Sequence, residues 1–106
     1  MIGYVTVGVL DMERAKDFYT KLFAGKGAKV VIDAGRIAFI GNRPDAPMLA
    51  VCEPYDGDAC VAGNGNMVAF AAASKDEVKE LYDKAFSLGA VDEGEPGQRV
   101  PVGVVV

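Results

Sequence analysis

Histidine is absent from this sequence of 106 residues, and its absence narrows the available chemistry. Acid–base catalysis near neutral pH and much metal binding depend on imidazole. A Ser-His-Asp triad, a Cys-His pair and a histidine-based metal site are therefore excluded. The only two cysteines, Cys52 and Cys60, are too few for a disulfide framework. We expect them to be reduced thiols in the cytoplasm.

Long apolar runs and an excess of positive charge are also missing. No apolar stretch reaches the ~18 residues that suggest a membrane span, and a net charge of −4 argues against nucleic-acid binding. The opening MIGYVTV has neither a basic region nor a small-residue cleavage site, so we expect no signal peptide. A hydrophobic content of 51% with 25% charged residues is typical of a globular chain, and the length predicts a single domain over residues 1–106.

The sequence contains an internal repeat at an offset of 63 residues. The segment YVTVGVLDMERAKDFYTKLF, beginning at Tyr4, aligns without gaps with MVAFAAASKDEVKELYDKAF, beginning at Met67. An internal repeat decides how the whole fold is interpreted. We interpret the chain as two copies of one module, covering residues 1–62 and 64–106.

Each copy begins with a predicted strand. In residues 2–9 valines alternate with other residues, which predicts a strand whose valine face packs on the following helix. The opposite face of this strand carries Tyr4, Thr6 and Gly8. It must contact something else, either solvent or a cavity.

An amphipathic helix follows in each copy. Asp11 is placed to cap the first helix, and Ser74 with Glu77 forms an S-x-x-E capping box for the second. Apolar residues then recur every three or four positions, which gives each helix one apolar stripe. We expect Gly25 and Gly89 to end the two helices.

The remaining predicted strands differ between the copies. In the first copy, residues 29–33 and 36–40 predict a hairpin and residues 48–53 a fourth strand. A polar linker covers residues 54–66.

In the second copy we predict strands at residues 67–73, 90–93 and 99–106. The repeat places a further strand at about residues 110–116. Because an apolar ending such as VPVGVVV would leave a bare strand edge, we expect the natural polypeptide to be longer.

Two βαβββ modules in one small chain resemble the vicinal oxygen chelate superfamily, which includes glyoxalase I, bleomycin-resistance proteins and extradiol dioxygenases. YVTVGVLDMERAKDFYTKLF resembles the family's first strand and helix, GNGNMVAFAAASKDEVKELYDKAF the second, and EPGQRVPVG a later turn and strand. The resemblance implies an α+β fold whose modules form a curved mixed sheet, a half-barrel cup with helices outside. From the resemblance we also expect that the last strand or strands of module two are missing from the chain.

The resemblance also implies where a metal would bind. The family's two histidine ligand positions fall on Tyr4 and Met67, its glutamate ligand on Ala50, and its fourth ligand in the missing strand. Neutral tyrosine and a thioether are poor ligands for divalent Mn, Ni or Zn, and alanine supplies no donor. We therefore predict no metal, no other cofactor and no catalytic residue.

The candidate ligand-binding residues are those that we place near the cup. They are Tyr4, Thr6, Arg36, Ala50, Cys52, Met67, Ala69 and Arg99. An apolar pocket with a few polar anchors is typical of small-molecule sites, and either arginine could hold a carboxylate or phosphate. The alternatives are that the arginines are exposed strand residues, that Met67 and Ala69 fill the core, and that Cys52 is an inert thiol.

We accordingly expect a metal-free protein of the bleomycin-resistance type that binds a small apolar or aromatic molecule in the cup. The alternative is a glyoxalase-type lyase or isomerase, or a dioxygenase-like enzyme, with a non-standard metal site. A third interpretation is a structural or regulatory dimer with a filled cup. Because open sheet edges need partners, we expect a homodimer.

Overall fold

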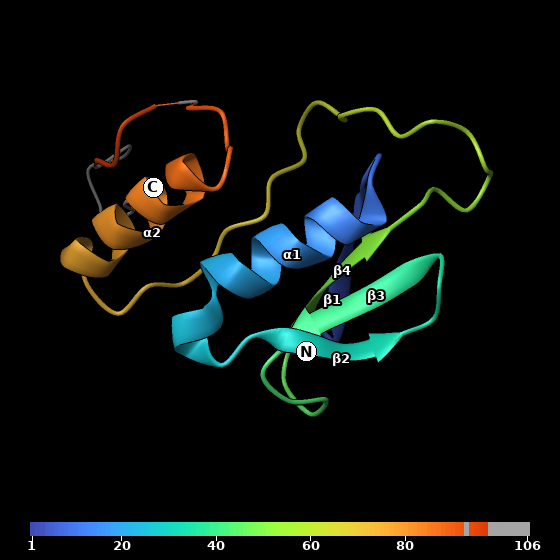
Figure 1. The fold of residues 1–106 in the computed structure, drawn as a ribbon, viewed down its shortest axis with the longest axis horizontal. Helices are drawn as coiled ribbons and strands as arrows, with labels where there is room; N and C mark the ends of the chain where they lie inside the picture. The colour runs from blue at the N-terminus through green and yellow to red at the C-terminus, as the bar shows by residue number, and fades with distance from the viewer. Residues whose placement is uncertain (93, 98–106) are drawn as a thin grey trace. The chain divides into compact units, whose positions relative to one another are not determined.

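The first 63 residues fold into a mixed sheet with a helix packed on one face (Figure 1). The computed structural model describes residues 1–92 and 94–97 and divides into two units, Met1–Gly63 and Asn64–Val106. The elements of the first unit are β1 (Tyr4–Gly8), α1 (Met12–Leu22), the 3-10 helix η1 (Ala24–Lys26), β2 (Lys29–Asp33), β3 (Ile37–Gly41) and β4 (Met48–Cys52). This order confirms the βαβββ module predicted for the first copy.

The sheet has the strand order β1-β4-β3-β2, so β1 and β2 form its two edges. β1 runs parallel to β4, while β4 with β3 and β3 with β2 are antiparallel. The β2–β3 pair carries a register shift between Val30 and Ile32. A parallel β1–β4 pair requires a crossover, and α1 lies in the connection that supplies it.

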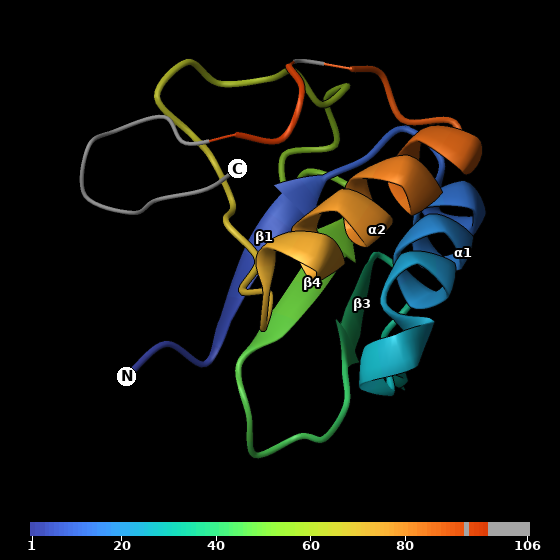
Figure 2. The same cartoon turned by 90° about the vertical axis from the view of Figure 1, so that its left-hand side faces the viewer.

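Helix α1 covers one face of this sheet, as the two views in Figures 1 and 2 show. The buried residues Ala38, Ile40 and Val51 form the centre of the core, and Ala15 and Tyr19 of α1 pack against them. The predicted stripe of α1 therefore faces the sheet. The valine face of β1 is only partly covered, because α1 packs mainly on the other three strands.

The ends of α1 show one correct prediction and one correction. Asp11 caps the helix as expected, since its Oδ1 accepts the backbone N–H of Arg14 at 3.1 Å. Gly25 does not end it. The helix ends one residue before Phe23, the chain tightens into η1, and the left-handed conformation falls on Gly27, with φ of +77°. The position that needs a positive φ comes after the extra 3-10 turn, at Gly27, and only glycine adopts a positive φ there without strain.

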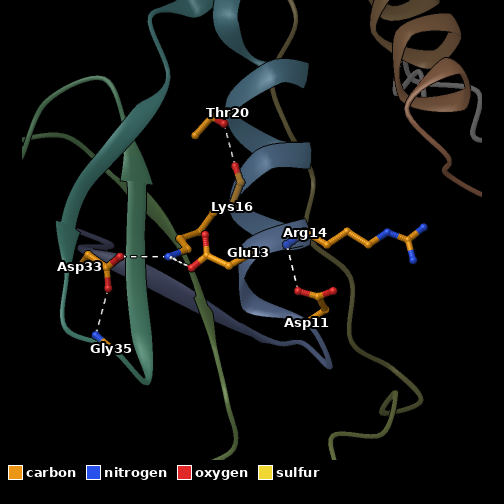
Figure 3. A network of polar contacts seen from close by, with 7 residues as sticks. All are labelled: Asp11, Glu13, Arg14, Lys16, Thr20, Asp33 and Gly35. Carbon is orange, nitrogen blue, oxygen red and sulfur yellow. Dashed lines mark hydrogen bonds and ion pairs between the residues drawn. The ribbon is translucent and has the colours of Figure 1, made fainter.

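A small polar network joins α1 to the β2–β3 hairpin (Figure 3). The ammonium group of Lys16 contacts Glu13 at 2.6 Å and Asp33 at 3.0 Å. The other oxygen of Asp33 accepts the backbone N–H of Gly35 at 3.0 Å and thereby shapes the hairpin turn. The bond from Gly35, followed by the one from Lys16, lowers the pKa of Asp33. Hydrogen bonds to Glu13 and Asp33 raise the pKa of Lys16.

The second unit contains the helix α2 (Lys75–Ser87), and its predicted ends are confirmed. The side chain of Ser74 accepts the N–H of Glu77 at 3.1 Å. The Glu77 carboxylate reaches back to the N–H of Ala73 at 2.7 Å, one residue before the cap. Gly89 follows the helix with φ of +104°. None of the residues of α2 is buried.

The strand predicted at residues 67–73 does not form, and residues 90–92 form no strand either. The counterpart of residues 67–73 in the repeat, β1, is held by a ladder to β4, whereas residues 67–73 form no ladder with any other described residues. Residue 93 and the strand predicted at 99–106 lie outside the described residues.

No helix in residues 1–92 and 94–97 combines the length and the apolar character that crossing a bilayer requires.

Candidate ligand-binding face

The sheet face opposite α1 carries most of the candidate residues that belong to the first unit, and we call it the open face. Successive side chains of a strand alternate between the two faces, and the register pairs Tyr4 with Met48, Thr6 with Ala50 and Phe39 with Ala50. The open face therefore carries Tyr4, Thr6 and Gly8 of β1, Met48, Ala50 and Cys52 of β4, and Ile37, Phe39 and Gly41 of β3. The structure thus brings Tyr4, Thr6, Ala50 and Cys52 onto one face of the sheet.

An aromatic pair lies at the centre of the open face. The rings of Tyr4 and Phe39 meet edge to face, with centroids 4.8 Å apart and an interplanar angle of 85°. They come from the two strands that flank β4, so they meet over β4. Ala50, on the same face of β4, is completely buried. Its small side chain leaves room for both rings. Tyr4 remains 50% exposed, so its ring is accessible to a ligand.

Phe39 was missed by the sequence analysis. The signal was present in its strand, because Phe39 lies between the core residues Ala38 and Ile40 and must point to the other face. What the local pattern lacks is the strand order, which places β3 next to β4 and thereby brings Phe39 close to Tyr4.

Polar groups and a flexible side chain surround the aromatic pair. Thr6 is exposed, and Cys52 at the end of β4 is partly buried. Met48 lies over Gly41, where an added methyl group would stand 2.8 Å from the Met48 Cγ atom. A thioether chain adapts readily to irregular shapes. The open face thus offers an aromatic and aliphatic surface with a hydroxyl and a thiol beside it.

Arg36 is not brought to this face. Arg36 stands two residues before Ala38 and four before Ile40, and both of these residues face α1. Because side chains alternate along a strand, Arg36 belongs to the helix side of the sheet and not to the open face. Its Nη1 donates to the carbonyl oxygen of Glu53 at 2.7 Å, and its guanidinium lies 5.3 Å from the ring centroid of Tyr55. Arg36 therefore fixes the segment after β4, a role that was not among the predicted ones.

The other candidates lie elsewhere. Met67 and Ala69 belong to the second unit, where both are exposed, Met67 to 80%. Arg99 lies outside the described residues. Their place in a binding site stays a prediction.

The second unit has a groove of its own, of about 630 Å³, between α2 and the turn that follows it. It is lined by Lys75, Asp76, Val78, Lys79, Tyr82, Asp83, Glu95, Pro96 and Gly97. Lys79 is paired with Asp83 at 2.9 Å. A hydrogen bond with Asp92 raises the pKa of Tyr82. Cations and carboxylates alternate along the groove, so its lining does not select one sign of charge.

The βαβββ order, the mixed sheet and the single helix-covered face define the first unit as a module of the vicinal oxygen chelate type. A family model described as the Glyoxalase/Bleomycin resistance protein/Dioxygenase superfamily matches residues 1–105, and the chain belongs to this superfamily.

One solved structure similar to this chain is the crystal structure of a glyoxalase/bleomycin resistance protein from Albidiferax ferrireducens T118. The match has a TM-score of 0.78 and 28% sequence identity, and it covers 92% of this chain and 77% of the other. A comparison with curated proteins gave no match.

The residues at the family's metal-ligand positions do not fit a divalent metal. In the first unit these positions hold a tyrosine ring packed edge-on against Phe39 and the buried methyl group of Ala50. The third, Met67, offers only a soft thioether. Throughout the part of the chain that the structure describes, no three cysteine or carboxylate side chains converge on one point.

Proposed function

We propose that this protein binds a small apolar or aromatic molecule on the open face without the help of a metal ion. The observation that carries the proposal is the Tyr4–Phe39 pair over the buried Ala50. Residues 1–63 leave part of this apolar surface uncovered, since Tyr4 stays half exposed. Exposed apolar surface of this kind commonly marks a binding site.

Physical chemistry supports an aromatic ligand in particular. Aromatic rings favour edge-to-face and offset contacts with one another, and an incoming ring can make such contacts with the accessible face of Tyr4. Thr6 and Cys52 at the margin add one hydroxyl and one thiol, which can orient a polar substituent of the ligand. A few polar groups beside an apolar surface are the usual composition of small-molecule sites.

The assembly and location belong to the same proposal. In the part of the chain that the structure describes, β1 and β2 are the edge strands of the sheet, and pairing with a second copy would extend one of these edges, which supports a homodimer. Cys52 and Cys60 are free thiols, which supports a reducing, cytoplasmic environment.

The test is thermal unfolding of chelator-treated protein with a panel of small aromatic compounds and with aliphatic compounds of equal size. A ligand present at a hundred times its dissociation constant adds about 2.7 kcal/mol to the stability of the native state. For a domain of this size that is a rise of several degrees in the unfolding midpoint. We expect aromatic compounds to produce such shifts and aliphatic ones to produce smaller shifts.

A matched pair of tyrosine variants locates the site. Tyr4→Leu removes the ring from the open face. Tyr55→Leu instead removes a ring that is 91% exposed and lies beside Arg36, away from the open face. We expect Tyr4→Leu to abolish the ligand-induced shift and Tyr55→Leu to retain it. Equal shifts in both variants would contradict the proposal. Conversion of a hemithioacetal after addition of a divalent metal would favour the enzymatic alternative instead.

A further inference from the structure

The two cysteines flank one glycine at the end of the open face. Cys52 is the last residue of β4, and its partner across the parallel β1–β4 pair is Gly8. Cys60, from the segment that follows β4, lies against the same Gly8. Both thiols are free and both residues are only partly buried. Residues eight positions apart in the sequence are thus brought to one point by the sheet.

The distances at Gly8 are short. A Cβ atom built on Gly8 would stand 3.0 Å from the Cβ atom and 3.9 Å from the Sγ atom of Cys60. The missing side chain of Gly8 is what allows Cys60 to approach the strand. Cys52 lies one strand away, at about 4.8 Å between neighbouring strands, and its side chain alternates to the same face as the Gly8 position.

Because both cysteines neighbour Gly8, they stand on the same side of one residue, which is the arrangement that a disulfide between them requires. A disulfide needs Cα atoms roughly 4.4–6.8 Å apart and Cβ atoms about 3.5–4.5 Å apart. The segment between the two cysteines contains an exposed turn, in which Gly57 has a φ of +78° and the N–H of Asp58 donates to Asp56 at 2.9 Å. Near its start the segment is held by Arg36, the residue before β3, whose guanidinium donates to the carbonyl oxygen of Glu53.

We propose that Cys52 and Cys60 are a redox-active dithiol pair that a peroxide closes to an intramolecular disulfide at the end of the open face. One thiolate attacks a peroxide oxygen, the O–O bond breaks, and a sulfenic acid and hydroxide form. The second thiolate attacks the sulfenic sulfur and displaces a second hydroxide as the S–S bond forms. The two thiols lose two electrons and two protons, and hydrogen peroxide is reduced to two water molecules.

The proposal does not rest on the proposed function, although Cys52 belongs to both, since it depends only on the two sulfurs and Gly8. Reversible disulfides of this kind are the form in which disulfides usually occur in a reducing compartment. A small thiol such as glutathione would reopen the bond by thiol–disulfide exchange.

The experiment treats the full chain with hydrogen peroxide, alkylates the remaining thiols and measures the intact mass without reductant. We expect a monomer that has lost two hydrogen atoms and has no thiol left to alkylate, and we expect dithiothreitol to restore both thiols. The single variants Cys52→Ser and Cys60→Ser should instead gain oxygen atoms or form disulfide-linked dimers. Oxygen addition to both cysteines of the unaltered chain, without hydrogen loss in the monomer, would overturn the proposal.

Two glycine variants test the geometry. Gly8→Ala places a methyl group against Cys60, whereas an added Cβ at Gly3, ahead of the same strand, has no neighbouring atom within 4 Å. We expect Gly8→Ala to slow disulfide formation on the order of tenfold, because small displacements of reacting atoms have large effects on rate. Gly3→Ala should oxidise at the original rate. Equal rates for the two variants would contradict the assigned positions.

A shifted thiol keeps the proposal testable if Gly8→Ala does not fold. In the double variant Ala59→Cys/Cys60→Ser the thiol moves by one residue along an exposed segment. It is expected to form no intramolecular disulfide at the peroxide concentration that oxidises the unaltered chain. Closure at the original rate would mean that the position of Cys60 beside Gly8 is irrelevant, and the proposal would fail. Circular dichroism establishes that each variant is folded.

Discussion

Replacing Val51 by alanine should lower the free energy of unfolding of the first unit more than replacing any exposed valine by alanine. Val51 is completely buried, at the centre of the core between the sheet and α1. The substitution removes two buried carbon atoms, each worth about 0.8 kcal/mol of transfer free energy. The cavity left behind adds to this cost. The free energy of unfolding should therefore fall by about 2–3 kcal/mol.

The assay is equilibrium unfolding in urea, followed by far-ultraviolet circular dichroism because the chain has no tryptophan. With a slope of roughly 1–3 kcal/mol per molar urea, the midpoint should fall by about 0.7–3 M while the slope stays unchanged. Val61→Ala is the control, because Val61 is 89% exposed and its replacement should cost less than about 0.5 kcal/mol. A cost for Val51→Ala no larger than that of the control would refute the placement of the core.

Three further predictions concern an ion pair, a helix cap and the floor of the open face. Because its pKa is lowered in the fold, the Asp33 carboxylate stabilises the protein above its unfolded pKa, and this contribution is lost as the pH falls through the folded value. When the free energy of unfolding is measured as the pH is lowered, it should decline less in Asp33→Asn than in the unaltered protein. Asp17→Asn is the control, because it removes an exposed ion pair with Lys21, and its decline should match that of the unaltered protein. Identical declines in the two variants would contradict the role of Asp33. Asp11→Ala should lower the free energy of unfolding by about 1 kcal/mol in urea titration, through loss of the cap of α1, and no change would contradict it. Ala50→Leu should separate the Tyr4 and Phe39 rings and cost about 1–3 kcal/mol by overpacking, measured in the same titration; a neutral result would mean that the rings do not meet over Ala50.

Much of the first unit follows from its sequence because the signals there are local and agree with one another. Alternation predicts the strands, Asp11 predicts the start of α1, and the apolar stripe predicts its buried side. The end of α1 was predicted at the wrong glycine, because several glycines stand close together and only the continuation into η1 decides which of them adopts positive φ.

What could not be predicted depends on partners that are distant in the sequence. Residues 67–73 carry a strand pattern, yet a strand forms only with a ladder partner, and a local pattern does not reveal the partner. The Tyr4–Phe39 contact depends on the sheet order. The position of Arg36 was likewise decided by Tyr55 and Glu53, in a loop whose path has no sequence signature.

The most direct test of metal-free binding on the open face is nuclear magnetic resonance on chelator-treated protein. Methyl resonances of Thr6 and Ala50 would be followed during titration with a small aromatic compound and, separately, with Zn²⁺ and Mn²⁺. We predict that the aromatic compound shifts or broadens these two resonances and leaves those of α2 unchanged, while the metals have no specific effect at Thr6 or Ala50. A specific metal effect at the open face, or ligand-induced shifts confined to the groove beside α2, would contradict the account.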